Sequence, residues 1–177
     1  MIVTVEGNDE SRGDGTGDLE QRIAETLTRS EQTAAAAESL TGGNVSAGLS
    51  AIPGASGWFV GGVVAYAAEV KFDLLGVDRG PVVNAATARQ MATGVARLLH
   101  ADFAVATTGV GGPGPQEDQP EGTVFIAVAA PSGCTDREYA FAGDPGAIIE
   151  QATNQALQDL AAAVTAAHVP NDQLSKA

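Results

Sequence analysis

The stretch Thr33-Ala34-Ala35-Ala36-Ala37-Glu38-Ser39-Leu40-Thr41-Gly42-Gly43 indicates the class of fold. Residues 33–37 are short and apolar, which predicts a buried strand. The next six residues break this pattern, and we expect a helix to start there and to run to about Ala51, before Pro53-Gly54. A buried strand that leads through a turn into a helix is the unit of layered α/β folds.

The rest of the chain repeats this alternation of short apolar runs with amphipathic segments. We expect further helices at about 18–29, 69–75, 85–100 and 145–167, and further strands at 59–66, 103–107, 123–130 and 137–141. The last two strands are separated by a turn and predict a hairpin, so the sheet is mixed. We expect one domain at 18–168, between a flexible N-terminal segment, 1–17, and a flexible tail, 169–177.

Composition excludes several classes of function. The net charge is −13, which argues against binding to nucleic acid or to an anionic membrane surface. Cys134 is the single cysteine, and no cluster of residues suggests a metal site, so we expect no metal and no cofactor. No segment has the length of a membrane span or the pattern of a signal peptide, which predicts a cytoplasmic protein.

Lys71 is one of only two lysines in the chain. A desolvated lysine can lose its proton, whereas arginine cannot, so Lys71 is a candidate general base. The competing interpretation is an ordinary surface lysine.

Ser39 follows the first predicted strand at the edge where ligands bind in open α/β sheets. The nearby helix start, with Thr41, Gly42 and Gly43, offers backbone N–H groups to a phosphate or to an oxyanion. A serine needs an adjacent base, and a Ser–Lys pair of Ser39 with Lys71 fits if the first two strands are neighbours. Capping of the helix by Ser39 or Thr41, without catalysis, is the alternative.

Tyr66 and Thr108 end the second and third predicted strands. Tyr66 could orient the lysine or donate a hydrogen bond to a carbonyl group, or it could simply be an edge aromatic. Thr108, followed by Gly109, could contact the substrate or cap the long loop at 109–122. The loop begins with a GxGxxG-like run but has no Walker lysine and no following helix, so a nucleotide-binding motif is excluded.

Together these segments resemble the CinA C-terminal domain family, which includes bacterial nicotinamide-nucleotide amidases. The resemblance covers about residues 19–160. The motifs that carry it are Ala37-Glu38-Ser39-Leu40-Thr41-Gly42-Gly43, Ile52-Pro53-Gly54-Ala55-Ser56, Tyr66 to Lys71 with Glu69, Leu74-Leu75-Gly76-Val77, Thr108-Gly109 with Gly112-Pro113, and Gly122-Thr123-Val124.

The resemblance implies a three-layer α/β/α sandwich with a mixed, mostly parallel sheet. It also implies a competence/damage-inducible type of protein that converts nicotinamide mononucleotide into nicotinate mononucleotide and ammonia, in pyridine-nucleotide salvage. By the family pattern Ser39 is the nucleophile, Lys71 is the base, and Tyr66 and Thr108 support them. The implied partner is a pyridine nucleotide or a related amide, and the family habit is compatible with a homodimer.

The chain departs from the family pattern at several positions. Ala68 stands where the family has asparagine, Asn84 where it often has serine, and Pro145 and Ile149 where it has arginines suited to a phosphate. Three hypotheses follow: an active amidase, an amidase with an altered and unphosphorylated substrate, or a non-catalytic assembly or ligand-binding domain.

Overall fold

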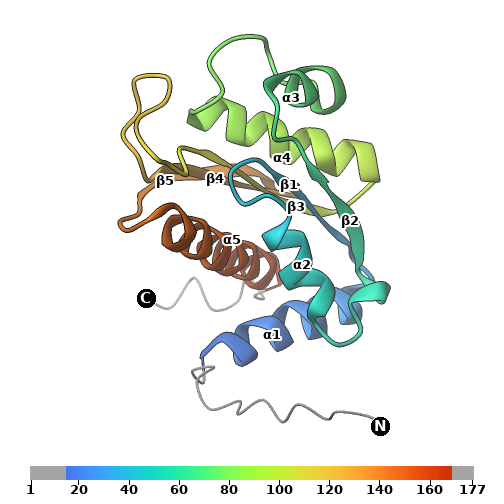
Figure 1. Ribbon diagram of the computed structural model, residues 1–177. Coiled ribbons are helices and arrows are strands. Elements are labelled where there is room, and N and C mark those ends of the chain that lie inside the picture. The colour runs from blue at the N-terminus through green and yellow to red at the C-terminus, as the bar shows by residue number, and fades with distance from the viewer. Residues whose placement is uncertain (1–14, 169–177) are drawn as a thin grey trace, which may run out of the picture.

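The computed structural model describes residues 15–168, which form a five-stranded sheet with helices on both faces (Figure 1). The predicted flexible ends lie outside this range, except for residues 15–17, which belong to the first helix. In chain order the elements are α1 (Gly15–Ser30), β1 (Ala34–Glu38), α2 (Asn44–Ala51), η1 (Ala55–Gly57), β2 (Phe59–Val64), α3 (Ala68–Leu75), α4 (Ala85–Leu99), β3 (Phe103–Gly109), β4 (Thr123–Ala130), β5 (Gly133–Ala140) and α5 (Pro145–Ala167).

The strands lie in the order β2-β1-β3-β4-β5. The central strand β1 is parallel to both β2 and β3, whereas β4 is antiparallel to β3 and to β5. In this sheet β4 therefore runs opposite to the other four strands. The predicted α/β fold with a mixed, mostly parallel sheet is confirmed.

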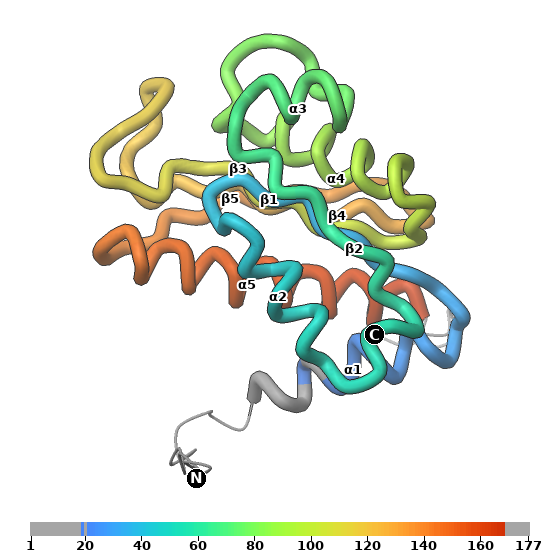
Figure 2. The backbone as a smooth tube through the Cα atoms, turned by 45° about the vertical axis from the view of Figure 1, so that its right-hand side comes forward, coloured from blue at the N-terminus to red at the C-terminus, as the bar shows by residue number. Residues whose placement is uncertain are grey.

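The helices form two layers around the sheet. Helices α3 and α4 cover one face, and α1, α2 and α5 cover the other (Figures 1 and 2). Each face has its own apolar core, with Met91 and Val95 of α4 on one side and Leu49 of α2 and Leu160 of α5 on the other. All five residues of β1 are buried, and four of them are alanines, which lets both helix layers approach closely.

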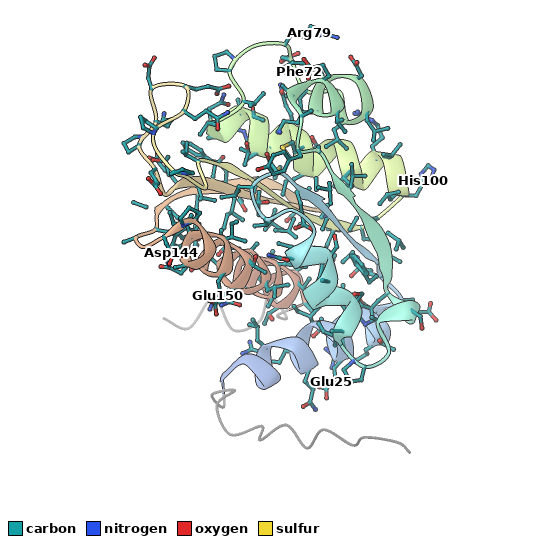
Figure 3. The ribbon with its side chains drawn as sticks, viewed as in Figure 1. Glu25, Phe72, Arg79, His100, Asp144 and Glu150 are labelled. Atoms are coloured by element: carbon teal, nitrogen blue, oxygen red, sulfur yellow. The ribbon has the colours of Figure 1, made fainter. Side chains whose placement is uncertain are left out.

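Several element boundaries differ from those expected from the sequence, among them the starts of α2 and β5. Helix α2 begins at Asn44, because Gly42 and Gly43 have φ values of 61° and 110°, in the left-handed region. Strand β5 begins at Gly133, so the hairpin turn is tighter than expected. The long last helix spans the predicted range. Its N-cap is Asp144, labelled in Figure 3, whose carboxylate accepts a hydrogen bond from Ala147 N at 2.9 Å.

Two further findings concern the described part of the chain. None of its helices combines the length and the hydrophobicity that crossing a membrane requires. Between residues 15 and 168, no group of three or more histidine, cysteine, aspartate or glutamate side chains is arranged to hold a metal ion.

Candidate active site

A cavity of about 380 Å³ lies at the edge of the sheet where β1, β2 and β3 end. The parallel pairing of β1 with both neighbours brings the residues that follow these strands to the same edge. Ser39, Tyr66, Lys71, Thr108 and Gly109 all line this cavity. Its volume falls within the range of roughly 300–1,000 Å³ that is typical of small-molecule sites.

Lys71 lies on α3, and its side chain reaches back to the end of β2. The residue is 1% exposed. Its Nζ donates hydrogen bonds to the backbone carbonyl groups of Ala65, at 2.6 Å, and Tyr66, at 3.2 Å. A neutral amine has two N–H bonds and one lone pair, so these two acceptors can take both hydrogens and leave the lone pair free.

Two effects act on the protonation of Lys71 in opposite directions. Burial lowers the pKa of Lys71 below its ordinary value, and the carboxylate of Glu117 partly offsets this by raising it. Glu117 belongs to the loop after β3. Its Oε2 accepts hydrogen bonds from Val82 N at 2.7 Å and from Val83 N at 2.8 Å, which fixes this loop along the cavity.

Ser39 is half-buried and follows β1 directly. Its N–H donates to Thr107 O at 3.1 Å, so the strand pairing continues through this residue. Ser39 and Lys71 line the same cavity, but no hydrogen bond joins Ser39 Oγ to Lys71 Nζ among the bonds of the described residues. Hydrogen bonds between catalytic groups often tighten only when substrate binds.

The two supporting residues contact the site differently from the sequence-based expectation. The phenol of Tyr66 is exposed, at 72% for the whole residue, and the backbone carbonyl of Tyr66 is what contacts Lys71. Thr108 is buried, and its hydroxyl donates to Val82 O at 2.7 Å. Thr108 thus ties β3 to the segment that precedes α4, as in the loop-capping interpretation. A Cβ on Gly109 would lie 2.5 Å from Thr123 O, so this wall of the cavity requires glycine.

The other predicted binding residues, Thr41, Gly42 and Gly43, do not line the cavity. Gly42 N donates to Ser39 O at 3.1 Å. Thr41 Oγ1, at 2.7 Å, and Gly43 N, at 3.0 Å, both donate to Glu38 Oε2. Thr41 and Gly43, before the start of α2, therefore hold a carboxylate of the protein itself, that of Glu38, instead of the external anion that the sequence suggested.

Several residues that line the cavity have a backbone N–H group that donates to no other described residue, and Leu40 and Gly111 are two adjacent ones. Leu40 and Gly111 line it, and no hydrogen bond between described residues uses the N–H of either. A Cβ on Gly111 would lie 3.7 Å from Leu40 Cβ, so the two residues are adjacent. Sequence reasoning missed this pair, because only the fold brings residue 111 beside the residue that follows Ser39.

The positions that depart from the family pattern are mostly on the cavity wall. Ala68, Pro145 and Ile149 line the cavity, whereas Asn84 caps α4 by accepting a hydrogen bond from Thr87 N at 2.8 Å. The ionisable side chains among the cavity-lining residues are those of Tyr66, Lys71 and Glu117. No arginine or histidine is among these lining residues.

A second cavity, of about 530 Å³, lies between β5 and the C-terminal half of α5. Its acidic side chains already have partners: Asp159 accepts from the Tyr139 hydroxyl at 2.7 Å and lies 4.0 Å from Arg137 Nη1, and Asp136 forms an ion pair with Arg89. We assign the chemistry to the smaller cavity, because that one combines a serine with a buried lysine.

The sequence of the chain is similar to those of known proteins. The family model of the CinA C-terminal domain matches residues 16–164. A CinA-like protein from Frankia casuarinae is 42% identical over 168 residues, which cover 92% of this chain and 38% of that protein. The chain thus spans well under half the length of this relative.

Solved structures give the same result. A CinA superfamily protein from Klebsiella pneumoniae superposes with a TM-score of 0.80 at 31% identity, covering 86% of this chain and 99% of the other. The competence/damage-inducible protein CihA from Agrobacterium tumefaciens gives a TM-score of 0.79 at 32% identity, covering 86% and 98%.

Proposed function

Because the chain belongs to the CinA C-terminal domain family, we propose that it is an amidohydrolase that hydrolyses nicotinamide mononucleotide or a closely related amide. Ser39 is the nucleophile and Lys71 is the general base. The observation that carries the proposal is the buried amine of Lys71, held by the carbonyl groups of Ala65 and Tyr66, on the same cavity as Ser39.

In the proposed reaction, Lys71 Nζ takes the proton of Ser39 Oγ as this oxygen attacks the amide carbon. The tetrahedral intermediate collapses when the C–N bond breaks, and the leaving nitrogen receives the proton from Lys71 and departs as ammonia. Water then attacks the acyl-serine ester, Lys71 again takes a proton, and the carboxylic acid is released with Ser39 restored.

The oxyanion of the tetrahedral intermediate needs preorganised donors. We assign this role to the N–H groups of Leu40 and Gly111, which line the cavity and have no hydrogen-bond partner among the described residues. The amides at the start of α2 are unsuitable, because Glu38 already accepts their hydrogen bonds. Removing one oxyanion donor typically costs about 10²–10³ in kcat.

Ammonia release tests the proposal directly. Purified protein is incubated with nicotinamide mononucleotide, and ammonia is measured for the wild type, Ser39→Ala and Ser56→Ala. Ser56 is an exposed residue of η1 outside the cavity and is the matched control. We expect release from the wild type and from Ser56→Ala, and none from Ser39→Ala. Absence of release from every amide tested would refute the hydrolase assignment.

A second candidate is the same chemistry on an unphosphorylated amide. The observation that favours it is the cavity wall, which carries Ala68, Pro145 and Ile149, and no arginine. A phosphate in this cavity would lie near the amine of Lys71 and the carboxylate of Glu117. The proposed reaction requires that amine to be uncharged. Nicotinamide riboside distinguishes the two candidates, because hydrolysis of the riboside without hydrolysis of the mononucleotide would support the second.

A further inference from the structure

The carboxylate of Glu38 is fully buried, and its oxygens accept hydrogen bonds from uncharged groups. Its Oε1 accepts from Ser46 N at 2.8 Å and from Ser46 Oγ at 2.6 Å. Its Oε2 accepts from Thr41 Oγ1 at 2.7 Å and from Gly43 N and Val45 N, both at 3.0 Å. No basic side chain in the described part of the chain forms an ion pair with Glu38.

These five hydrogen bonds close the turn between β1 and α2 around one side chain. The first free N–H groups of a helix favour an anion, and here the anion is supplied from the preceding strand. The Glu38 side chain does not line the cavity. The N–H groups at the start of α2 that donate to Glu38 therefore need no acceptor from the substrate or from water in the cavity.

Glu38 ends β1 and Ser39 follows it in a bend, and their side chains lie in different surroundings. Glu38 points toward α2, and Ser39 lines the cavity with Lys71. The backbone of Glu38 also reaches the lysine: its carbonyl accepts from Ala65 N at 2.7 Å, and the carbonyl of Ala65 accepts from Lys71 Nζ. Anchoring of Glu38 thus fixes both the turn that presents the serine and the strand end that holds the amine.

We propose that Glu38 is a positioning residue, whose buried carboxylate holds the turn after β1 so that Ser39 faces Lys71. The proposal rests on the proposed amidohydrolase function for its catalytic consequence. A displacement of about 1 Å between reacting groups can lower a rate by about 10²-fold. Loss of the anchor therefore lowers kcat by about 10- to 100-fold and changes KM little, because Glu38 contacts no substrate.

The test uses Glu38→Gln in the full chain. Glutamine keeps the size of the side chain, but its amide nitrogen cannot accept, so donors at one end of the carboxylate lose their acceptor. The control is Leu160→Ala, which destabilises the fold by removing a buried side chain of α5 that neither lines the cavity nor forms a hydrogen bond with Glu38. Each variant is studied at a temperature where it is folded, and four quantities are measured: kcat, KM, the rate of labelling of Ser39 by a fluorophosphonate, and hydrogen exchange of residues 39–47.

We expect Glu38→Gln to lose kcat and labelling rate about 10-fold or more and to exchange faster within residues 39–47 than elsewhere, whereas Leu160→Ala keeps its kcat. Normal kcat and labelling in Glu38→Gln, or faster exchange spread evenly over the whole chain, would overturn the positioning role. If the wild type neither hydrolyses nor labels, the amidohydrolase assignment fails. Exchange at residues 39–47 then still decides whether Glu38 fixes the turn.

Discussion

Replacing Gly62 with alanine tests the anchoring of Glu38 from the neighbouring strand. Gly62 lies on β2, and an added Cβ would be 2.1 Å from Ser46 Oγ and 3.2 Å from Ser46 Cβ. The hydroxyl must rotate away, and it then loses its 2.6 Å bond to Glu38. Hydrogen bonds to charged groups contribute about 1.5–3 kcal/mol, so we expect Gly62→Ala to lower the free energy of unfolding by about 2 kcal/mol.

Ser46→Ala loses the same hydrogen bond directly, so its cost is also about 2 kcal/mol. The two changes remove one interaction, and the double variant is expected to lose about 2 kcal/mol rather than the additive value of about 4 kcal/mol. Urea unfolding followed by the fluorescence of Trp58, which is the single tryptophan and is buried, measures each value.

The control for this cycle is Gly57→Ala. An added Cβ at Gly57 meets no heavy atom within 4 Å, and its backbone is outside the left-handed region. Its expected effect is below about 0.5 kcal/mol. Additive costs in the double variant, or a neutral Gly62→Ala, would refute the idea that Gly62 makes room for the Ser46–Glu38 bond.

Four further predictions concern the cavity. Lys71→Arg is expected to abolish hydrolysis because arginine stays protonated, and an active variant would show that a fixed positive charge suffices. The pKa of Lys71 is lower in the folded state than its ordinary value of 10.5 in the unfolded chain. Between these two pKa values the unfolded state binds more protons, so the free energy of unfolding rises with pH. We expect this rise to be absent in Lys71→Met. Glu117→Gln keeps an oxygen acceptor for Val82 N and Val83 N but removes the charge that raises the pKa of Lys71, so the acidic limb of kcat/KM should move to lower pH, and an unmoved limb would exclude the coupling. Gly111→Pro removes the N–H group of residue 111 and should lower kcat about 10²-fold. Gly111→Ala keeps this N–H group and should stay active. Equal kcat values in the two folded variants would exclude the oxyanion role.

Much of the fold follows from local patterns in the sequence. Helix α5 has the predicted bounds because Asp144 caps its start and apolar residues recur at helical spacing behind it. The alanine run of β1 predicts a buried strand, since residues this small and apolar fit between two helix layers. The start of α2 was predicted too early, because the strand continues through Glu38 and the glycines at 42 and 43 take left-handed conformations.

The site was less accessible to sequence reasoning. Ser39 and Lys71 stand out by residue type and by their position after strands, and the pairing of β1 with β2 places them on one cavity. The role of Glu38 could not be predicted, because it depends on donors up to eight residues away that converge only in the folded turn. The hydrogen bond between Val82 N and Glu117 could not be predicted either, since it spans 35 residues of chain. Long-range contacts of this kind leave no periodic signal in a single sequence.

The loop after β3 bears on how this protein could acquire new specificities. Its residues line the outer wall of the cavity and are fastened by Glu117 to residues 82 and 83, outside the sheet. Ser39 follows β1 and Lys71 lies on α3, on separate segments of the polypeptide. The wall that this loop forms can therefore change by insertion or substitution while the segments that carry Ser39 and Lys71 stay the same, so under the proposed function the preferred substrate can change separately from the reaction.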